Sequence, residues 1–365
     1  MTIERTSLHA EHVRLGARMV DFAGWDMPLH YGSQLDEHRR VRESAGMFDV
    51  SHMAVTEVLG SGARAYLQHL LANDVGRLHY GQALYTCMLN EQGGVIDDLI
   101  VYRFDGRDEY RIISNAGTRA KDLAWMRGHT ADFDVTLHER NDVALIAVQG
   151  PKARALVHKV LGDPEVIKAA EALKNFYSIV AGNLFIARTG YTGEDGYEIM
   201  LPAVEAPAFW QALLNVGVAP AGLGSRDTLR LEAGMALYGQ DMDENVTPLE
   251  AGLGWTVAWH PAERDFIGRA ALEKQRAGTW HKSTGLVLPG KGVLRAHQKI
   301  YAGDREIGEI TSGSFSPVLD HAIALARIEQ NVTEECTVDV RGKRLPVRIV
   351  TPPFVRHGKA LVAVE

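Results

Sequence analysis

The sequence has only two cysteines and no apolar run long enough to cross a bilayer. Cys87 and Cys336 stand apart, without a CxxC pattern, which argues against a disulfide framework or a cysteine-based zinc site. No run of about 18 apolar residues occurs, and residues 1–20 lack the apolar stretch of a secretion signal. We therefore expect a soluble, cytoplasmic protein in a reducing compartment, with no membrane partner.

An excess of positive charge is also missing. The chain has 39 Lys and Arg against 46 Asp and Glu, a formal net charge of -7, so nucleic acid is not an expected partner. Despite 15 histidines there is no HExxH array, and no metal is expected. The sequence also lacks GxSxG, GxGxxG and GxxxxGK[ST], which disfavours a serine hydrolase of the usual type, a Rossmann dehydrogenase and a P-loop enzyme.

What the chain does have is a mixture of helical and strand patterns over 365 residues, 46% of them hydrophobic. Capping and periodicity predict helices that include residues 33–45, 62–72 and 118–129. Short connections between strand-like runs predict an antiparallel meander over 83–90, 95–104 and 109–115. Because helices and strands do not alternate strictly, the pattern favours an α+β fold over a doubly wound sheet.

The predicted secondary structure changes near residue 281. From there to the end, short strand-like runs follow one another with turns and no convincing helix. We therefore expect two parts, an α+β region over 1–280 and a small β-barrel or sandwich over 281–365.

The stretch "GGVIDDLIVY", residues 93–102, places two adjacent acids in an apolar strand. Since neighbouring side chains of a strand point to opposite faces, Asp97 and Asp98 cannot share one environment. One of them is a candidate for stabilising positive charge, because a carboxylate removed from water needs a cation, a ligand or hydrogen bonds. The plainer interpretation puts both acids at the wet end of the strand, beside the Gly93-Gly94 turn.

Two further segments carry candidate chemistry. In "RTGYTGEDGYEIML", residues 188–201, Tyr191 could form an aromatic wall and Glu198 could accept two hydrogen bonds from adjacent N–H donors, although an ordinary hairpin loop would look the same. Glu194 and Asp195 would repel anions there. In "GLGSRDTLRLEAG", residues 222–234, Ser225 could cap a helix that carries Arg226 and Arg230 on one face, where an anion or surface acids would relieve their repulsion.

Taken together, several motifs spread over about 300 residues resemble the aminomethyltransferase, or T-protein, family of the glycine cleavage system. Besides the three segments above, these motifs are "MVDFAGWDMPLHY" (19–31), "FDVSHM" (48–53), "VQGP" (148–151), "LYGQDMDE" (237–244) and "ITSGSFSPVL" (310–319). Each motif is weak alone, and their order and spacing make the resemblance specific. It implies a folate-binding aminomethyltransferase fold, with two interlocked antiparallel-sheet lobes and a C-terminal β-barrel around a central channel.

The resemblance also implies a reaction. The family takes the aminomethyl group from the lipoyl arm of H-protein, transfers its carbon to tetrahydrofolate and releases ammonia. By similarity Asp98 is the catalytic acid, which stabilises the cation left when the thiolate departs, whereas Asp97 points away. The residues that the resemblance assigns to the folate are Glu198 and Arg226, the flanking rings Tyr191 and Tyr102, the channel residues Tyr85 and Asn115, and Arg356 near the glutamate tail.

Two other interpretations share the fold. A relative could demethylate an O- or S-methyl donor, in which case Glu198 would be retained and the donor would differ. A folate-binding protein of iron–sulfur assembly would carry a KGCYxGQ-like motif, whereas this chain reads "RTGYTGED" without a cysteine.

Overall fold

The computed structural model describes residues 3–105, 109–332 and 335–364. The chain forms two compact units and passes between them several times. The first unit contains Met1–Leu67, Val75–Tyr85 and Leu99–Asp227, and the second contains Gln68–Asp74, Thr86–Asp98 and Thr228–Glu365.

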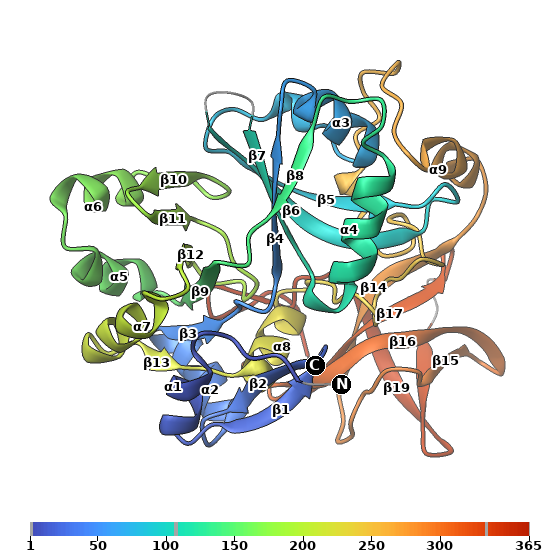
Figure 1. Ribbon diagram of the computed structural model, residues 1–365. Helices are drawn as coiled ribbons and strands as arrows, with labels where there is room; N and C mark the ends of the chain where they lie inside the picture. The colour runs from blue at the N-terminus through green and yellow to red at the C-terminus, as the bar shows by residue number, and fades with distance from the viewer. Residues whose placement is uncertain (1–2, 106–108, 333–334, 365) are drawn as a thin grey trace. The chain divides into compact units, whose positions relative to one another are not determined.

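A six-stranded sheet is the main frame of the first unit. Its strands, in spatial order, are β10 (Ser178–Ala181), β11 (Leu184–Ala187), β12 (Gly196–Pro202), β9 (Val143–Gln149), β3 (Gly46–Asp49) and β13 (Ala219–Pro220). The pairs are antiparallel except β13 with β3, which is parallel. Three helices lie beside this sheet (Figure 1), and they are α5 (Ala153–Leu161), α6 (Pro164–Glu171) and α7 (Ala206–Asn215).

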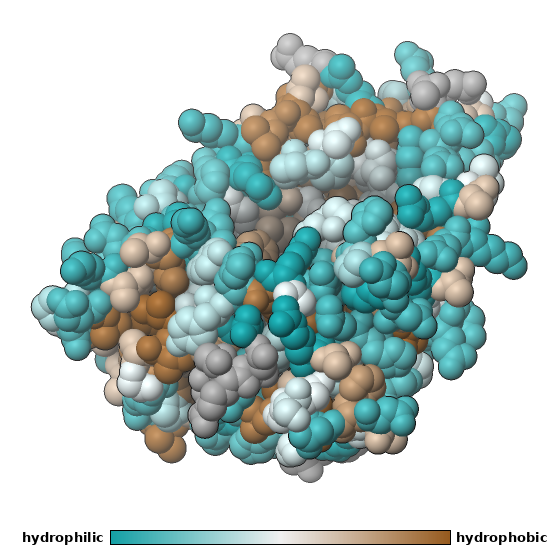
Figure 2. Space-filling model, turned by 90° about the horizontal axis from the view of Figure 1, so that it is seen from above, coloured by the Kyte–Doolittle hydropathy of each residue, from teal (hydrophilic) through white to brown (hydrophobic). Residues whose placement is uncertain are grey.

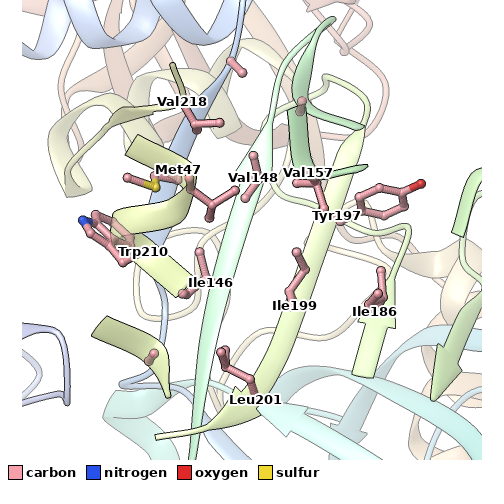
Figure 3. Close-up of a cluster of buried hydrophobic side chains, with 14 of the residues drawn as sticks. Met47, Ile146, Val148, Val157, Ile186, Tyr197, Ile199, Leu201, Trp210 and Val218 are labelled. Atoms are coloured by element: carbon pink, nitrogen blue, oxygen red, sulfur yellow. The ribbon is translucent and has the colours of Figure 1, made fainter. Parts of the chain in front are cut away.

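The helical side of this sheet holds a hydrophobic core. Alternate residues of β12, namely Tyr197, Ile199 and Leu201, point into it and meet Val157 of α5 and Trp210 of α7 (Figure 3). Because side chains alternate along a strand, Glu198 leaves β12 on the other face, away from the helices. The apolar periodicity of β12 therefore fixes the direction of this carboxylate.

The N-terminal part of the first unit packs helices against a two-stranded hairpin. Its elements are α1 (His9–Arg14), β1 (Arg18–Phe22), β2 (Trp25–His30) and α2 (Gln34–Glu43). Ser33 caps α2, since its hydroxyl accepts a hydrogen bond from the amide of Asp36 at 3.3 Å. This confirms the helix start predicted from the sequence.

A second sheet has five strands in the order β5-β6-β7-β4-β8, and β5 and β6 run across the division between the two units. The strands are β5 (Ala83–Leu89), β6 (Val95–Asp105), β7 (Glu109–Ser114), β4 (Ala54–Leu59) and β8 (Thr136–Glu139), and the nearby helices are α3 (Ala63–Leu70) and α4 (Arg119–Gly128). The consecutive order β5-β6-β7 confirms the predicted meander, and α3 and α4 confirm two predicted helices.

The second unit contains a closed six-stranded barrel. Its strands, in barrel order, are β14 (His281–Leu288), β17 (His321–Glu329), β16 (Arg305–Ser316), β15 (Lys299–Ala302), β18 (Cys336–Val340) and β19 (Lys343–Val350). Aliphatic side chains such as Leu286, Ile310 and Val338 fill the interior. Of the two expected forms, barrel or sandwich, the barrel is confirmed.

The remaining elements are short. They are α8 (Leu223–Glu232), which spans the division at residue 227, α9 (Arg269–Arg276), β20 (Val355–Arg356), β21 (Lys359–Ala360) and the 3-10 turns η1 (Val75–Arg77), η2 (Ala116–Thr118) and η3 (Gly254–Thr256). Hydrophilic side chains cover much of the face seen in Figure 2, and hydrophobic residues interrupt this cover in patches. Such exposure is ordinary for a globular protein surface.

Candidate active site

Glu198 lies in a row of four buried residues on the face of the six-stranded sheet that points away from the core of α5 and α7. Paired in register across β3, β9, β12 and β11, the row contains Phe48, Ala147, Glu198 and Ala187. Glu198 is 8% exposed. Its Oε2 accepts a hydrogen bond from the hydroxyl of Thr189 at 2.6 Å. A carboxylate held in so little water is a strong acceptor for a ligand with N–H donors.

The loop between β11 and β12 is held by buried and half-buried arginines. Arg188 binds both oxygens of Asp195, each at 2.8 Å. Arg42 of α2 binds Glu194 at 2.8 Å, with side chains 4% and 2% exposed. The two acids that the sequence analysis expected to repel anions are therefore neutralised by arginines, a pairing that adjacent sequence positions do not reveal.

Gln149, at the end of β9, braces the same loop from inside. Its Nε2 donates to the carbonyl of Thr189 at 3.1 Å, and its Oε1 accepts from the hydroxyl of Thr192 at 2.9 Å. Gly190 passes so close that a Cβ there would lie 1.9 Å from Oε1 of Gln149. The glycine is thus needed for this close approach.

Tyr191, at the tip of the braced loop, stacks with Arg226. The guanidinium carbon of Arg226 lies 4.9 Å from the centre of the Tyr191 ring and 6.0 Å from that of Phe48. Burial lowers the pKa of Arg226, and the negative charge of Glu198 opposes this shift. Its Nη1 is buried and has no hydrogen-bond partner among the described residues. A buried, unsatisfied guanidinium nitrogen is a position where a ligand acceptor fits.

A shallow depression lies beside Arg226. Its lining consists of Pro28, Phe48, Asp49, Ala221, Gly222, Leu223 and Arg226, all in the first unit.

The other aromatic and amide candidates of the first unit differ in exposure. Tyr102 of β6 is fully buried, its ring is edge-on to Phe185 at 5.1 Å, and its hydroxyl lies 3.0 Å from that of Thr189. Tyr85 and Asn115 are half-buried. Glu198, Arg226, Tyr191 and Tyr102 therefore belong to one connected set of contacts and charges.

Asp97 and Asp98 lie on β6 in the second unit, with Asp97 fully buried and Asp98 half-buried. The interpretation that both acids sit at a wet strand end is wrong, because Asp97 has no exposed surface. Burial raises the pKa of the Cys87 thiol on β5, and the charges of both acids add to this rise. Arg356, the candidate for the glutamate tail, is exposed on β20.

Two expectations for α8 are wrong. Ser225 does not cap the helix, since α8 begins at Leu223 and the Ser225 hydroxyl donates to the carbonyl of Gly222 at 2.9 Å. Arg230 does pair with an acid, Asp241 at 3.0 Å, but the pair is not at the surface, because Arg230 is 1% exposed. Asp241 comes from the acidic loop 237–244, whose charge is thus used in an ion pair.

A buried polar cluster in the first unit was not predicted from the sequence. Oδ2 of Asp49 lies 2.6 Å from the hydroxyl of Thr6 and 2.9 Å from Nε2 of His12, and Nδ1 of His12 lies 2.8 Å from the hydroxyl of Tyr31. His52 follows Ser51, whose amide donates to Oδ1 of Asp49 at 2.9 Å. His52 is 5% exposed, and its pKa falls to about 4 chiefly because of burial. The only local signal was the motif "FDVSHM".

Within the described ranges, no group of three or more His, Cys, Asp or Glu side chains is placed to hold a metal ion. No helix among the described residues is long and apolar enough to cross a membrane.

Comparison with known proteins places this architecture in a class. The sequence profile of the GCVT N-terminal domain matches residues 8–261, and that of the glycine cleavage T-protein C-terminal barrel domain matches residues 282–356. The chain is 56% identical to an aminomethyltransferase of Pseudomonas syringae pv. tomato over 98% of this chain and 99% of that protein.

A crystal structure agrees with the sequence comparison. The glycine cleavage system aminomethyltransferase T from Bartonella henselae has a TM-score of 0.91 and 33% identity, covering 97% of this chain and 99% of that one. The chain therefore belongs to the aminomethyltransferase family of the glycine cleavage system, which confirms the resemblance seen in its motifs. The expected enzyme class, a transferase, and the α+β fold with a C-terminal barrel are confirmed as well.

Proposed function

We propose that this enzyme transfers the aminomethyl carbon from the lipoyl arm of H-protein to tetrahydrofolate. The carbon leaves sulfur, bonds to N5 and then N10 of the folate, and loses its nitrogen as ammonia; the products are 5,10-methylenetetrahydrofolate and dihydrolipoyl H-protein. The observation that carries the proposal is a buried Glu198 carboxylate whose charge acts on Arg226, a residue with a buried Nη1 that has no hydrogen-bond partner among the described residues.

The chemistry of these groups fits a reduced pterin. A carboxylate matches the adjacent 2-amino and N3–H donors of the pterin, and a guanidinium matches a ring or carboxylate acceptor. Tyr191 supplies a flat wall that Arg226 already holds in place. The fully buried position of Tyr102 supports a role behind the carboxylate.

Asp98 is proposed as the catalytic acid. Positive charge develops on the aminomethyl carbon as its bond to sulfur breaks, and a fixed carboxylate stabilises such charge and orients the folate amine. The half-buried state of Asp98 supports this role, because a group that touches substrate needs access that the fully buried Asp97 lacks.

The remaining assignments are part of the same proposal. Tyr85 and Asn115 line the folate channel, and Arg356 meets the glutamate tail, for which its exposure is suitable. We place the domain boundary at residues 280 and 281, supported by the start of β14 at His281. The enzyme would act in the cytoplasm.

One assay tests the function. The pure protein is incubated with aminomethylated, lipoylated H-protein, with and without tetrahydrofolate, and ammonia is measured. We expect ammonia release that depends on both tetrahydrofolate and the loaded H-protein. If ammonia release does not depend on the folate, the transferase reaction proposed here is wrong.

A further inference from the structure

We propose that Thr189 is a positioning residue that aims the Glu198 carboxylate, and that Tyr102 acts on folate binding through Thr189 without touching the pterin. This inference rests on the proposed function, in which Glu198 receives the pterin. It gives Tyr102 a different place from the ring-flanking one that the family resemblance implied.

The direction of the hydrogen bonds follows from proton counting. Thr189 has one hydroxyl proton, which it donates to Oε2 of Glu198 at 2.6 Å. The Thr189 oxygen must therefore accept in its contact with Tyr102, and the Tyr102 hydroxyl, 3.0 Å away, must donate. The result is a relay from Tyr102 through Thr189 to Glu198, in which every proton points toward the carboxylate.

Burial makes this relay rigid. Tyr102 is fully buried, Thr189 is 7% exposed and Glu198 is 8% exposed. The Tyr102 ring packs edge-on against Phe185, with ring centres 5.1 Å apart, which fixes the ring as well as the hydroxyl. Since the ring is enclosed and the hydroxyl is used, Tyr102 has no surface left to flank a ligand.

The backbone of Thr189 is fixed independently. Gln149 donates to its carbonyl at 3.1 Å, and Glu198 is itself held in register with Ala147 of β9. The hydroxyl that meets Oε2 is thus carried by a segment that cannot shift without breaking buried contacts. Because one oxygen of Glu198 is held, the plane of its carboxylate is fixed before the ligand binds. Ligand binding then costs less conformational entropy in this side chain.

The experiment compares Thr189→Val, Thr189→Ser and Tyr102→Phe with the parent protein. Valine keeps the shape of threonine and removes the hydroxyl, whereas serine keeps the hydroxyl. Thr284→Val is the matched control, because it removes a buried hydroxyl in the barrel, 3.3 Å from the carbonyl of Val350. The Kd of tetrahydrofolate is measured by calorimetry, and kcat is measured at saturating folate.

We expect Thr189→Val to raise the Kd of tetrahydrofolate about tenfold, the loss typical of a hydrogen bond to a charged group. Its kcat should fall much less, since Thr189 does not touch the reacting atoms. Thr189→Ser should restore most of the affinity. Tyr102→Phe should raise the Kd about threefold, because it removes the outer bond of the relay, and Thr284→Val should leave the Kd unchanged.

Several results would overturn the inference. An unchanged Kd in Thr189→Val, or a serine variant as weak as the valine variant, would remove the role of the hydroxyl. Should Thr189→Val fail to fold, Tyr102→Phe decides, and an unchanged Kd there contradicts the relay. Glu198→Gln separates this failure from that of the proposed function: if it binds tetrahydrofolate as the parent does, Glu198 is not the pterin receptor.

Discussion

Arg42 and Glu194 form an ion pair across 2.8 Å, with side chains 4% and 2% exposed. Arg42 also donates to the carbonyl of Thr192 at 2.6 Å. A single side chain of α2 therefore anchors the loop that presents Tyr191. Its removal would leave the Glu194 charge buried without its counter-charge, which is more costly than the loss of a surface pair.

We expect Arg42→Ala to lower the free energy of unfolding by about 3 kcal/mol and to raise the Kd of tetrahydrofolate. Urea denaturation and calorimetry measure the two effects. Arg39→Ala on the same helix is the control, because its pair with Asp36 spans 3.5 Å with side chains 57% and 69% exposed. This variant should change stability by less than about 0.5 kcal/mol. Equal effects of the two variants would show that burial of the pair does not matter.

Asp97 and Asp98 allow the same chemical change to be made at two neighbouring positions of β6. Asp98→Asn should lower kcat by about 100-fold or more while folate still binds, because the charge that stabilises the reaction is lost. Asp97→Asn should chiefly lower stability, by about 2 kcal/mol, since this side chain is fully buried. Single-turnover ammonia release and urea denaturation separate the two effects.

Glu198→Ala completes this comparison. It should abolish measurable tetrahydrofolate binding and leave the thermal unfolding of the protein close to that of the parent. If Asp98→Asn lost binding and Glu198→Ala lost only turnover, the roles of the two acids would be reversed.

Local patterns predicted the parts of the fold that local forces decide. The Ser33 cap and the meander of β5 to β7 follow from capping and turn length. The start of α8 does not follow, because the amide of Gly222 is held by Glu37, a residue 185 positions away. Ser225, the local candidate for a cap, lies inside the helix.

The residues that support Glu198 and its neighbouring loop were not predicted from the sequence. Family resemblance named Glu198 and Arg226, whose chemistry suits a ligand. Thr189 and Gln149 could not be found in this way, since a buried hydroxyl or amide gains its role only from partners brought close by the sheet. The interpretation that placed Asp97 at a wet strand end failed for the same reason, because the burial of a strand residue depends on segments that are distant in sequence.

His52 should make stability depend on pH. Its pKa falls from 6.5 to about 4 through burial and the charge of Arg226, while Asp49 opposes the shift. Below pH 6.5 the unfolded chain binds a proton at this histidine, whereas the folded protein binds it only near pH 4. The free energy of unfolding therefore decreases as the pH is lowered from 6.5 to 4. At pH 4.5 the loss from this residue is about 2 kcal/mol relative to pH 7.

The measurement is urea denaturation of the parent and of His52→Gln at pH 7 and pH 4.5. The variant should lose about 2 kcal/mol less than the parent between these pH values. His79→Gln, at an exposed histidine, should lose as much as the parent. A parent and a His52→Gln variant with parallel losses would mean that His52 takes up its proton normally in the folded protein.

The buried pair of Arg230 and Asp241 should respond unequally to the removal of either partner. Asp241 has other donors that would still satisfy it, namely the hydroxyl of Ser312 at 2.8 Å, the amide of Leu237 at 2.8 Å and the hydroxyl of Thr311. Arg230 loses its counter-charge when Asp241 is removed. Asp241→Leu should therefore cost about 4 kcal/mol, and Arg230→Met about 2 kcal/mol.

The double variant tests whether this asymmetry comes from the charge. Arg230→Met with Asp241→Leu removes both charges, so its loss of stability should be smaller than the sum of the two single losses by at least about 2 kcal/mol. Urea denaturation of the four proteins gives the coupling energy. Additive losses would mean that the two side chains contribute by packing alone. A larger loss of stability in Arg230→Met than in Asp241→Leu would contradict the expected asymmetry. It would mean that the remaining contacts of Arg230, to the Ser312 hydroxyl and the Met235 carbonyl, satisfy the arginine better than the three donors satisfy Asp241.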